Sequence, residues 1–431
     1  MTITNNARGA LPSGSLAGEI PRGRLPRIIL VTDTPPLKNS IGAYKTLQNL
    51  FVKYPMGEIL CVAPDDAFNG KVDNPELTRP TVRAGSRSHF PIPLNRCRGF
   101  SSLLNLAINS HWNDRARGLV PDEARRFKAD LIIACPMDWW GVVMAMRMGR
   151  ELNLPVVPYF MDNILSGLGR PPWTGLIWKR LREMLTGADG WIMISKTLAE
   201  DLAASLGVPV ARRLCISHNP VELSKMPAPK FGARQGPEFR ILYTGSIWAM
   251  HIDAIEIVAR AVALLRKAGL QVSLDIATQE KFWDEHRARF EPHGVRYVGF
   301  LSHDACFRCM AEADLLLVAV SFQDWLLPFA RGSFQTKMTD YMSTGRPILC
   351  CGPATSVCGS YLEENRCGYF WKKPDPEGLA LFLQSLIHDQ TGQDEAARNA
   401  YALLERDYSA KKMQGELYTF LEDTASQRIA T

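Results

Sequence analysis

The sequence predicts an α/β protein with two doubly wound parallel sheets, on three observations. The chain has 431 residues, enough for two or three domains. Short apolar runs alternate along most of it with segments of helical spacing, which is typical of parallel sheets covered by helices on both faces. A Pro-, Lys- and Gly-rich stretch near the middle divides the alternation into two series, so we expect two Rossmann-like domains that face a central cleft.

Composition places the chain among ordinary globular proteins, at 46% hydrophobic and 22% charged residues. The ten cysteines have no framework spacing, which favours a reduced, cytoplasmic compartment. Residues 1–26 are rich in Gly, Pro, Ser and Arg, and we interpret them as a disordered lead-in rather than a signal peptide. No run of 18 uncharged apolar residues exists, so no membrane span is expected.

The net charge of +6 is concentrated in residues 1–222, where basic residues outnumber acidic ones. This half is the one expected to meet an anionic surface, such as the cytoplasmic face of a membrane. Residues 170–182 mix Trp and Leu with bases, which fits either an interfacial helix or a surface helix whose apolar side is core. Nucleic acid is not an expected partner, because no reading motif accompanies the charge.

The first domain is predicted over 27–222. Its apolar runs predict strands at 27–32, 58–63, 130–134, 156–160, 191–194 and 214–217. Helical spacing predicts helices at 41–53, 142–152 and 174–185, and Ser195 is the expected N-cap of another. Residues 223–237 are rich in Pro, Lys and Gly and form the predicted linker.

The second domain is predicted over 238–400, with a separate helical segment at 401–431. Strands are expected at 239–244, 271–277, 295–300, 314–320 and 347–351. Helices are expected at 252–268, 303–312, 334–344, 357–365, 375–388, 393–406 and 408–424.

Lys337 and Asp340 are the strongest candidate site residues. Their spacing of three places both side chains on one face of the predicted 334–344 helix. An ammonium group suits phosphate as a point charge, and a carboxylate that only accepts hydrogen bonds suits a vicinal diol. The alternative is a solvated helix acid with Lys337 as its ion-pair partner.

Further candidates lie where predicted strands end, which is where ligands bind in such folds. Gly245 allows close backbone approach after the 239–244 strand. Asp138, with two neighbouring Trp residues, and Asp162 follow strands of the first domain and are candidates to hold an acceptor; a capped turn over core Trp is the alternative for Asp138. Gly42 lies between the first strand and the first helix and is expected to face the same cleft.

No metal or cofactor is expected. Cys306 and Cys309 have no second pair at zinc spacing, so an ordinary helix is the better interpretation. The sequence has no D-x-D triplet to hold a metal–diphosphate complex, and it has no P-loop, H-E-x-x-H or G-x-S-x-G motif.

Three segments carry a resemblance to a known family: 241–246 (ILYTGS), 298–301 (VGFL) with the following helix and Ala313-Asp314, and 335–348 (QTKMTDYMSTGRPI). They resemble the donor-binding domain of the retaining glycosyltransferases of family 4, also called group 1, which have the GT-B fold. Ala188-Asp189 before a strand, and the stretch 219–222 (NPVE), are more weakly similar.

The resemblance implies a metal-independent glycosyltransferase in polysaccharide biosynthesis. Such an enzyme takes a nucleoside-diphosphate sugar and a saccharide or lipid-linked acceptor, and it retains the anomeric configuration. The resemblance also implies that the C-terminal helix crosses back onto the first domain. A nucleotide-sugar epimerase of the same fold and a degenerate, non-catalytic binding protein remain alternatives.

Residue roles are implied in the same way. Asp340 takes the position of the family's ribose-binding Glu, and Lys337 that of the diphosphate ligand. Backbone groups of Phe300 and Leu301 are expected at the nucleobase, with plain apolar packing as the alternative.

This chain also departs from the family pattern. The family's other acid is replaced by Gly332, which with Ser333 is expected to offer backbone N–H groups at a helix start. The family's Arg and Lys after Gly245 are replaced by Ser246 and His251. His251 is expected either to contact phosphate as a cation or to be a surface residue. The family's His near Asp138 is absent.

Overall fold

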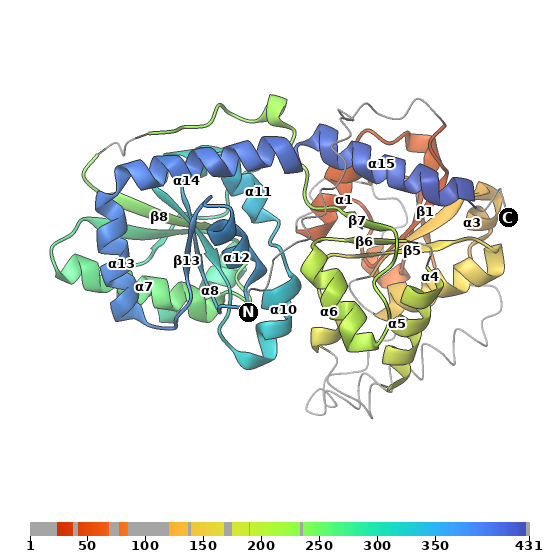
Figure 1. Cartoon of the computed structure of the whole chain (residues 1–431), viewed down its shortest axis with the longest axis horizontal. Coiled ribbons are helices and arrows are strands. Elements are labelled where there is room, and N and C mark those ends of the chain that lie inside the picture. Colours follow the sequence, from red (N-terminus) through yellow and green to blue (C-terminus); the bar gives the residue numbers. More distant parts are fainter. Residues whose placement is uncertain are drawn as a thin grey trace, which may run out of the picture.

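The computed structural model describes residues 24–37, 42–68, 77–84, 120–136, 139–167, 175–188, 190–232 and 236–427. Figure 1 shows two sheets in separate halves of the molecule, each surrounded by helices. The predicted lead-in lies outside these residues except for its last three positions. Asp138 also lies outside them, so its predicted role stays a prediction.

The first sheet has seven parallel strands among the described residues, in the order β3-β2-β1-β4-β5-β6-β7. The strands are β1 (Ile28–Thr32), β2 (Ile59–Ala63), β3 (Thr81–Arg83), β4 (Leu131–Cys135), β5 (Val156–Phe160), β6 (Trp191–Met193) and β7 (Leu214–Ile216). Its helices are α1 (Ala43–Phe51), α3 (Asp122–Phe127), α4 (Trp139–Leu152), α5 (Gly175–Gly187) and α6 (Lys196–Leu206). Every residue of β1, β2 and β4 is buried, because helices and neighbouring strands cover them on all sides.

The second sheet has six parallel strands in the order β10-β9-β8-β11-β12-β13. They are β8 (Phe239–Thr244), β9 (Val272–Ala277), β10 (Arg296–Tyr297), β11 (Leu315–Ala319), β12 (Ile348–Cys351) and β13 (Tyr369–Trp371). Its helices are α7 (Ile252–Lys267), α8 (Glu280–Phe290), α9 (His303–Glu312), α10 (Leu327–Gly332), α11 (Lys337–Met342), α12 (Val357–Glu364), α13 (Pro376–His388) and α14 (Gln390–Leu403).

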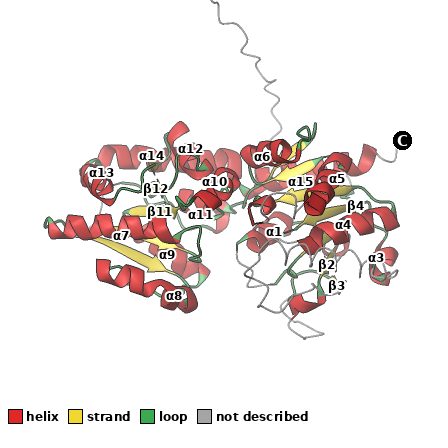
Figure 2. Ribbon diagram, turned by 90° about the horizontal axis from the view of Figure 1, so that it is seen from below, coloured by secondary structure: helices red, strands yellow, loops and turns green. Residues whose placement is uncertain are grey.

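Side chains of β8 alternate between two apolar clusters on opposite faces of this sheet. Ile241 and Tyr243 pack with α7 and α13, whereas Leu242 packs in the cluster that includes residues of α9 and α11. Figure 2 shows helices on both sides of the strands in each domain. The predicted α/β class with two doubly wound sheets is confirmed.

The C-terminal helix α15 (Ala410–Gln427) returns to the first domain, where it lies across that half of the molecule (Figure 1). The Tyr418 hydroxyl donates to the Leu50 carbonyl (2.8 Å), and Gln414 Nε2 donates to the Asn49 carbonyl (2.8 Å). Both acceptors are on α1, so these hydrogen bonds attach the C-terminal helix to α1 of the first domain.

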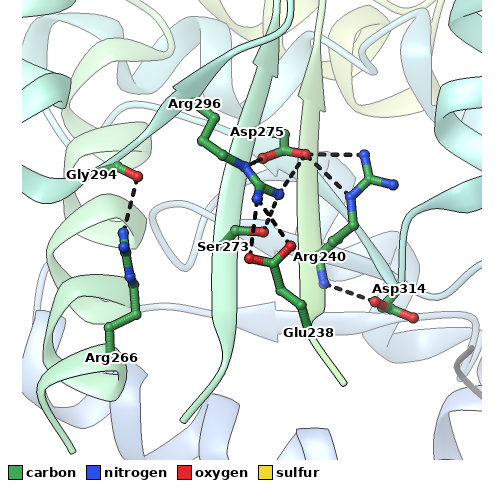
Figure 3. A network of polar contacts seen from close by, with 8 residues as sticks. All are labelled: Glu238, Arg240, Arg266, Ser273, Asp275, Gly294, Arg296 and Asp314. Carbon is green, nitrogen blue, oxygen red and sulfur yellow. Dashed lines mark hydrogen bonds and ion pairs between the residues drawn. The ribbon is translucent and has the colours of Figure 1, made fainter. Parts of the chain in front are cut away.

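A buried carboxylate, Asp275 on β9, is the centre of a polar network in the second sheet (Figure 3). Its Oδ1 accepts from Arg296 Nε (2.6 Å), and its Oδ2 accepts from Arg240 Nη2 (3.1 Å). Arg296 also reaches Glu238 and Ser273. Asp275 is only 4% exposed, so the two guanidinium groups compensate a charge that water does not reach.

The structure differs from the expected elements where local signals are weak. The predicted 334–344 helix is shorter and begins at Lys337, and the predicted 295–300 strand is reduced to β10. Strand β13 was not predicted, because its three residues are only partly buried at a sheet edge. Helix α8 was also missed, since its charged sequence buries only Trp283 and Phe290.

The basic segment 170–182 includes the first part of helix α5. Within it, Leu181 is buried and Trp178 is partly buried against the core. The side chains of Trp173, Leu176 and Ile177 lie outside the description, so the choice between an interfacial helix and a surface helix stays open. Among the described residues, no helix is both long and apolar enough to span a bilayer.

Candidate active site

A cleft of about 400 Å³ lies between the two domains at the carboxyl ends of strands from both sheets. Its walls include Gly42, Asp162, Gly245, Ser246, His251, Phe300, Leu301, Ser333, Lys337 and Asp340. Ten of the twelve predicted site residues therefore meet here, with Gly42 and Asp162 on the first-domain wall. Gly332 does not line the cleft, and Asp138 lies outside the described residues. Concave sites of this size are where small ligands bind in such folds.

Lys337 begins α11 and directs its ammonium group at the end of β8. Its Nζ lies 3.8 Å from the centre of the Tyr243 ring, and a Cβ on Gly245 would lie 3.4 Å from this Nζ. The Nζ is buried and has no hydrogen-bond partner, Asp340 included. Burial lowers the pKa of Lys337 to about 7. A buried amine without a hydrogen-bond partner is a candidate binding group for an anionic ligand, which would supply the missing partner and favour the charged amine.

Asp340 lies one turn further along α11 and is half-buried. Its Oδ1 accepts from Asn219 Nδ2 at 3.4 Å. Burial raises the pKa of Asp340 to about 7, while the positive charge of Lys45, the Asn219 amide and Lys337 act in the opposite direction. The alternative of an ion pair between Asp340 and Lys337 is therefore wrong, because Lys337 Nζ has no hydrogen-bond partner. Asp340 is also not a freely solvated helix acid, since it is half-buried in the cleft wall.

Gly245 and His251 form the wall at the end of β8. Gly245 has a φ of 109°, in the region that favours glycine. His251 immediately precedes α7 and is buried, so the expected surface histidine is wrong. Burial and the nearby Lys337 hold the pKa of His251 well below its usual range. His251 lines the cleft, and its contact with phosphate stays a prediction.

Asp162 faces the cleft from the first domain, just after β5. Its carboxylate accepts a hydrogen bond from the Ser333 hydroxyl of the second domain. Burial raises the pKa of Asp162 to about 6, against the effect of that hydrogen bond. The two domains thus touch through a carboxylate that also lines the cleft.

Gly332 does not begin a helix, contrary to the expectation. It ends α10, and its carbonyl accepts from the Ser195 hydroxyl of the first domain (2.9 Å). A Cβ at this position would lie 2.9 Å from Leu198 Cδ1, so glycine permits close domain contact here. The Ser333 N–H is already bonded to the Phe329 carbonyl and is not free for a phosphate.

Phe300 is 68% exposed on the cleft wall, so plain apolar packing is the wrong interpretation for its ring. Leu301 is half-buried against the core, as that alternative expected. An exposed ring beside a cleft offers a flat surface on which a base can stack.

Several lining residues were missed from the sequence. They are Trp248, Thr278, Gln279, Gln335 and Thr336. Thr278 and Gln279 directly follow β9, so the strand-end rule applied to Gly245 would also have found them. Among the described residues, no group of three or more His, Cys, Asp or Glu side chains is arranged to hold a metal ion.

Known proteins share both the fold and the second domain. Residues 238–389 match the family model described as glycosyl transferases group 1. Anabaena Alr3699/HepE, solved in complex with UDP-glucose, is similar over 94% of this chain and 100% of its own, at 15% identity and a TM-score of 0.59. Sucrose-phosphate synthase from Thermosynechococcus elongatus is similar over 92% and 99%, at 14% identity and a TM-score of 0.63. TarM is similar over 92% and 98%, at 12% identity and a TM-score of 0.60. No curated protein matches the sequence.

The chain therefore has the GT-B fold, and residues 238–389 of its second domain are similar to the glycosyl transferases group 1 model.

Proposed function

We propose that this protein is a glycosyltransferase, which moves a sugar from a nucleoside-diphosphate sugar, with UDP-glucose as the first candidate, to a saccharide or lipid-linked acceptor. The observation that carries the proposal is the buried, unpartnered Lys337 ammonium group beside Gly245, with Asp340 one turn away in the same cleft. UDP-glucose is chosen because the similar Anabaena protein was solved with it.

The donor diphosphate binds at Lys337 and the start of α7. Burial disfavours the charged form of Lys337, and a nearby anion favours it. Donor binding therefore raises the pKa of Lys337, and the amine becomes protonated near neutral pH. The α7 N-terminus adds its partial positive charge on the same wall. Negative charge grows on the leaving diphosphate during transfer, and these fixed positive groups stabilise it.

The ribose diol binds at Asp340, and the nucleobase stacks near Phe300. An ionised carboxylate accepts hydrogen bonds from both ribose hydroxyls. The acceptor binds on the first-domain wall, where Asp162 takes one of its hydroxyl groups. With burial raising its pKa to about 6, Asp162 is mostly ionised at neutral pH and accepts such a bond.

Retention of configuration, independence of metal and a cytoplasmic location at the membrane face are parts of the same proposal. NMR of the product anomer tests the first, and activity in excess EDTA tests the second. Co-sedimentation with anionic vesicles tests membrane contact, which the excess of basic residues in 1–222 favours.

The decisive experiment measures release of UDP from UDP-glucose with and without candidate acceptors. Release that requires acceptor supports the transferase. A sugar isomerised without acceptor indicates the epimerase alternative. Donor binding without any turnover across a broad acceptor panel indicates the non-catalytic alternative.

A further inference from the structure

Asn219 connects the acid of the second domain to the first domain. It follows β7 in the segment that leaves the first sheet, and it is only 4% exposed. Its Nδ2 donates to Asp340 Oδ1 (3.4 Å) and Thr339 Oγ1 (3.3 Å). Its Oδ1 accepts from Asn49 Nδ2 (2.9 Å). Both polar atoms of this buried side-chain amide therefore have hydrogen-bond partners: those of Nδ2 lie on α11 and that of Oδ1 lies on α1.

Helix α1 presents one face to this group. Gly42, Lys45 and Asn49 are spaced by three and four residues, so they lie on the same side of the helix. Gly42 lines the cleft, the charge of Lys45 acts on Asp340, and Asn49 holds Asn219. Gln414 of α15 holds the Asn49 carbonyl, which fixes this part of α1 in place.

We propose that Asn219 is a positioning residue for donor recognition: it orients the Asp340 carboxylate for the ribose diol and makes that orientation depend on α1 of the first domain. The inference rests on the proposed role of Asp340. It adds a physical link by which the acceptor domain controls how well the donor domain binds its ligand.

The charges around Asp340 explain why an amide is needed. Burial favours the neutral acid, which must use one oxygen as a donor and so accepts a diol less well. Lys45 from α1, Lys337 from α11 and the Asn219 amide favour the ionised form. The remaining neighbours, Cys306 and Tyr341, have pKa values raised by burial and stay neutral. Removing the Asn219 amide therefore raises the pKa of Asp340 further.

The test is the ratio of UDP-glucose dissociation constants for Asn219→Ala and wild type, measured by calorimetry from pH 6 to pH 9. If the variant raises the pKa of Asp340 by one unit, the ionised fraction falls about ninefold at pH 6, about fivefold at pH 7 and hardly at all at pH 9. Titration of Lys337 affects both proteins and cancels in the ratio. We expect a loss that high pH rescues, and the same trend for Lys45→Met and, more weakly, for Asn49→Ala.

Asn365→Ala is the matched control, because Asn365 donates to the Tyr361 carbonyl away from the cleft. It should leave the donor affinity unchanged at every pH. A ratio of one for Asn219→Ala, or a loss equal at pH 6 and pH 9, would overturn the proposal. If Asn219→Ala does not fold, Asn49→Ala gives the same test from helix α1, because Asn49 is the residue that donates to the Asn219 amide oxygen.

An Asp340→Asn background separates this inference from the proposed function. In that background Asn219→Ala should add no pH-dependent loss. If Asp340→Asn itself leaves donor affinity intact, the ribose role fails and the proposed function with it. If Asp340→Asn weakens the donor but Asn219→Ala does not, only the positioning role fails.

Discussion

Replacing Lys337 by Met should stabilise the ligand-free protein and abolish most donor-induced stabilisation. Burial lowers the pKa of Lys337 from 10.5 to about 7. Each unit corresponds to about 1.4 kcal/mol, so keeping the ammonium charged costs about 5 kcal/mol in the ligand-free fold. Met keeps a similar length and carries no charge, and its sulfur tolerates the Tyr243 ring that Lys337 now faces.

The pH dependence of this gain has a definite sign. Between pH 7 and 10.5 the unfolded chain holds the lysine proton and the folded chain does not, so wild-type stability rises with pH in this window. The advantage of Lys337→Met is therefore largest at pH 6–7, about 3 kcal/mol smaller at pH 9, and gone near pH 10.5.

Urea unfolding followed by tryptophan fluorescence at pH 6, 8 and 10, with and without UDP-glucose, measures both effects. Lys372→Met is the control, because Lys372 forms an exposed ion pair with Glu363 and its loss should change the unfolding free energy little. A Lys337→Met protein that is less stable than wild type at pH 6, or that keeps full donor stabilisation, would refute the assignment.

Three further predictions follow from the same geometry. Asp340→Asn should weaken UDP-glucose binding by about tenfold to a hundredfold, since charge-assisted hydrogen bonds are worth about 1.5–3 kcal/mol. Burial raises the pKa of Asp340 from 3.8 to about 7, so wild-type stability falls as pH rises through that window. The Asn variant should therefore be the more stable ligand-free protein at pH 8 but not at pH 4; equal unfolding curves at both pH values would contradict this. Gly245→Ala places a methyl group beside Lys337 Nζ at a φ of 109°. It should cost about 1 kcal/mol of stability and reduce donor affinity, whereas Gly269→Ala, at a similar φ far from the cleft, should cost stability alone. Asp275→Ala removes the acceptor shared by the part-exposed guanidinium groups of Arg240 and Arg296 and should lower the unfolding free energy by about 1.5–3 kcal/mol, with UDP-glucose affinity unchanged in the folded fraction. An unfolding free energy within about 1 kcal/mol of wild type, roughly the effect of an ordinary substitution, would show that the network is dispensable.

Features that depend on neighbours in sequence were predictable. The apolar run of β8 identifies a strand buried on both faces, and Ser302 caps α9 through the Ala305 N–H three residues ahead. That Lys337 and Asp340 lie on one helix face also follows from their spacing alone. Each of these needs only a periodicity or a capping geometry, which the local chain determines.

Only the tertiary structure determines the protonation of the site residues and their contacts across the two domains. Residues distant in sequence bury Asp340, Lys337 and His251, and this burial sets their protonation, which no spacing reveals. Gly332 was expected at a helix start but lies against Leu198 of the other domain, 134 residues away in the chain. The link from Asp340 through Asn219 to Asn49 likewise joins three separate segments. Desolvation and cross-domain hydrogen bonds depend on what surrounds a group in space, and so they exist only once both domains have folded against each other.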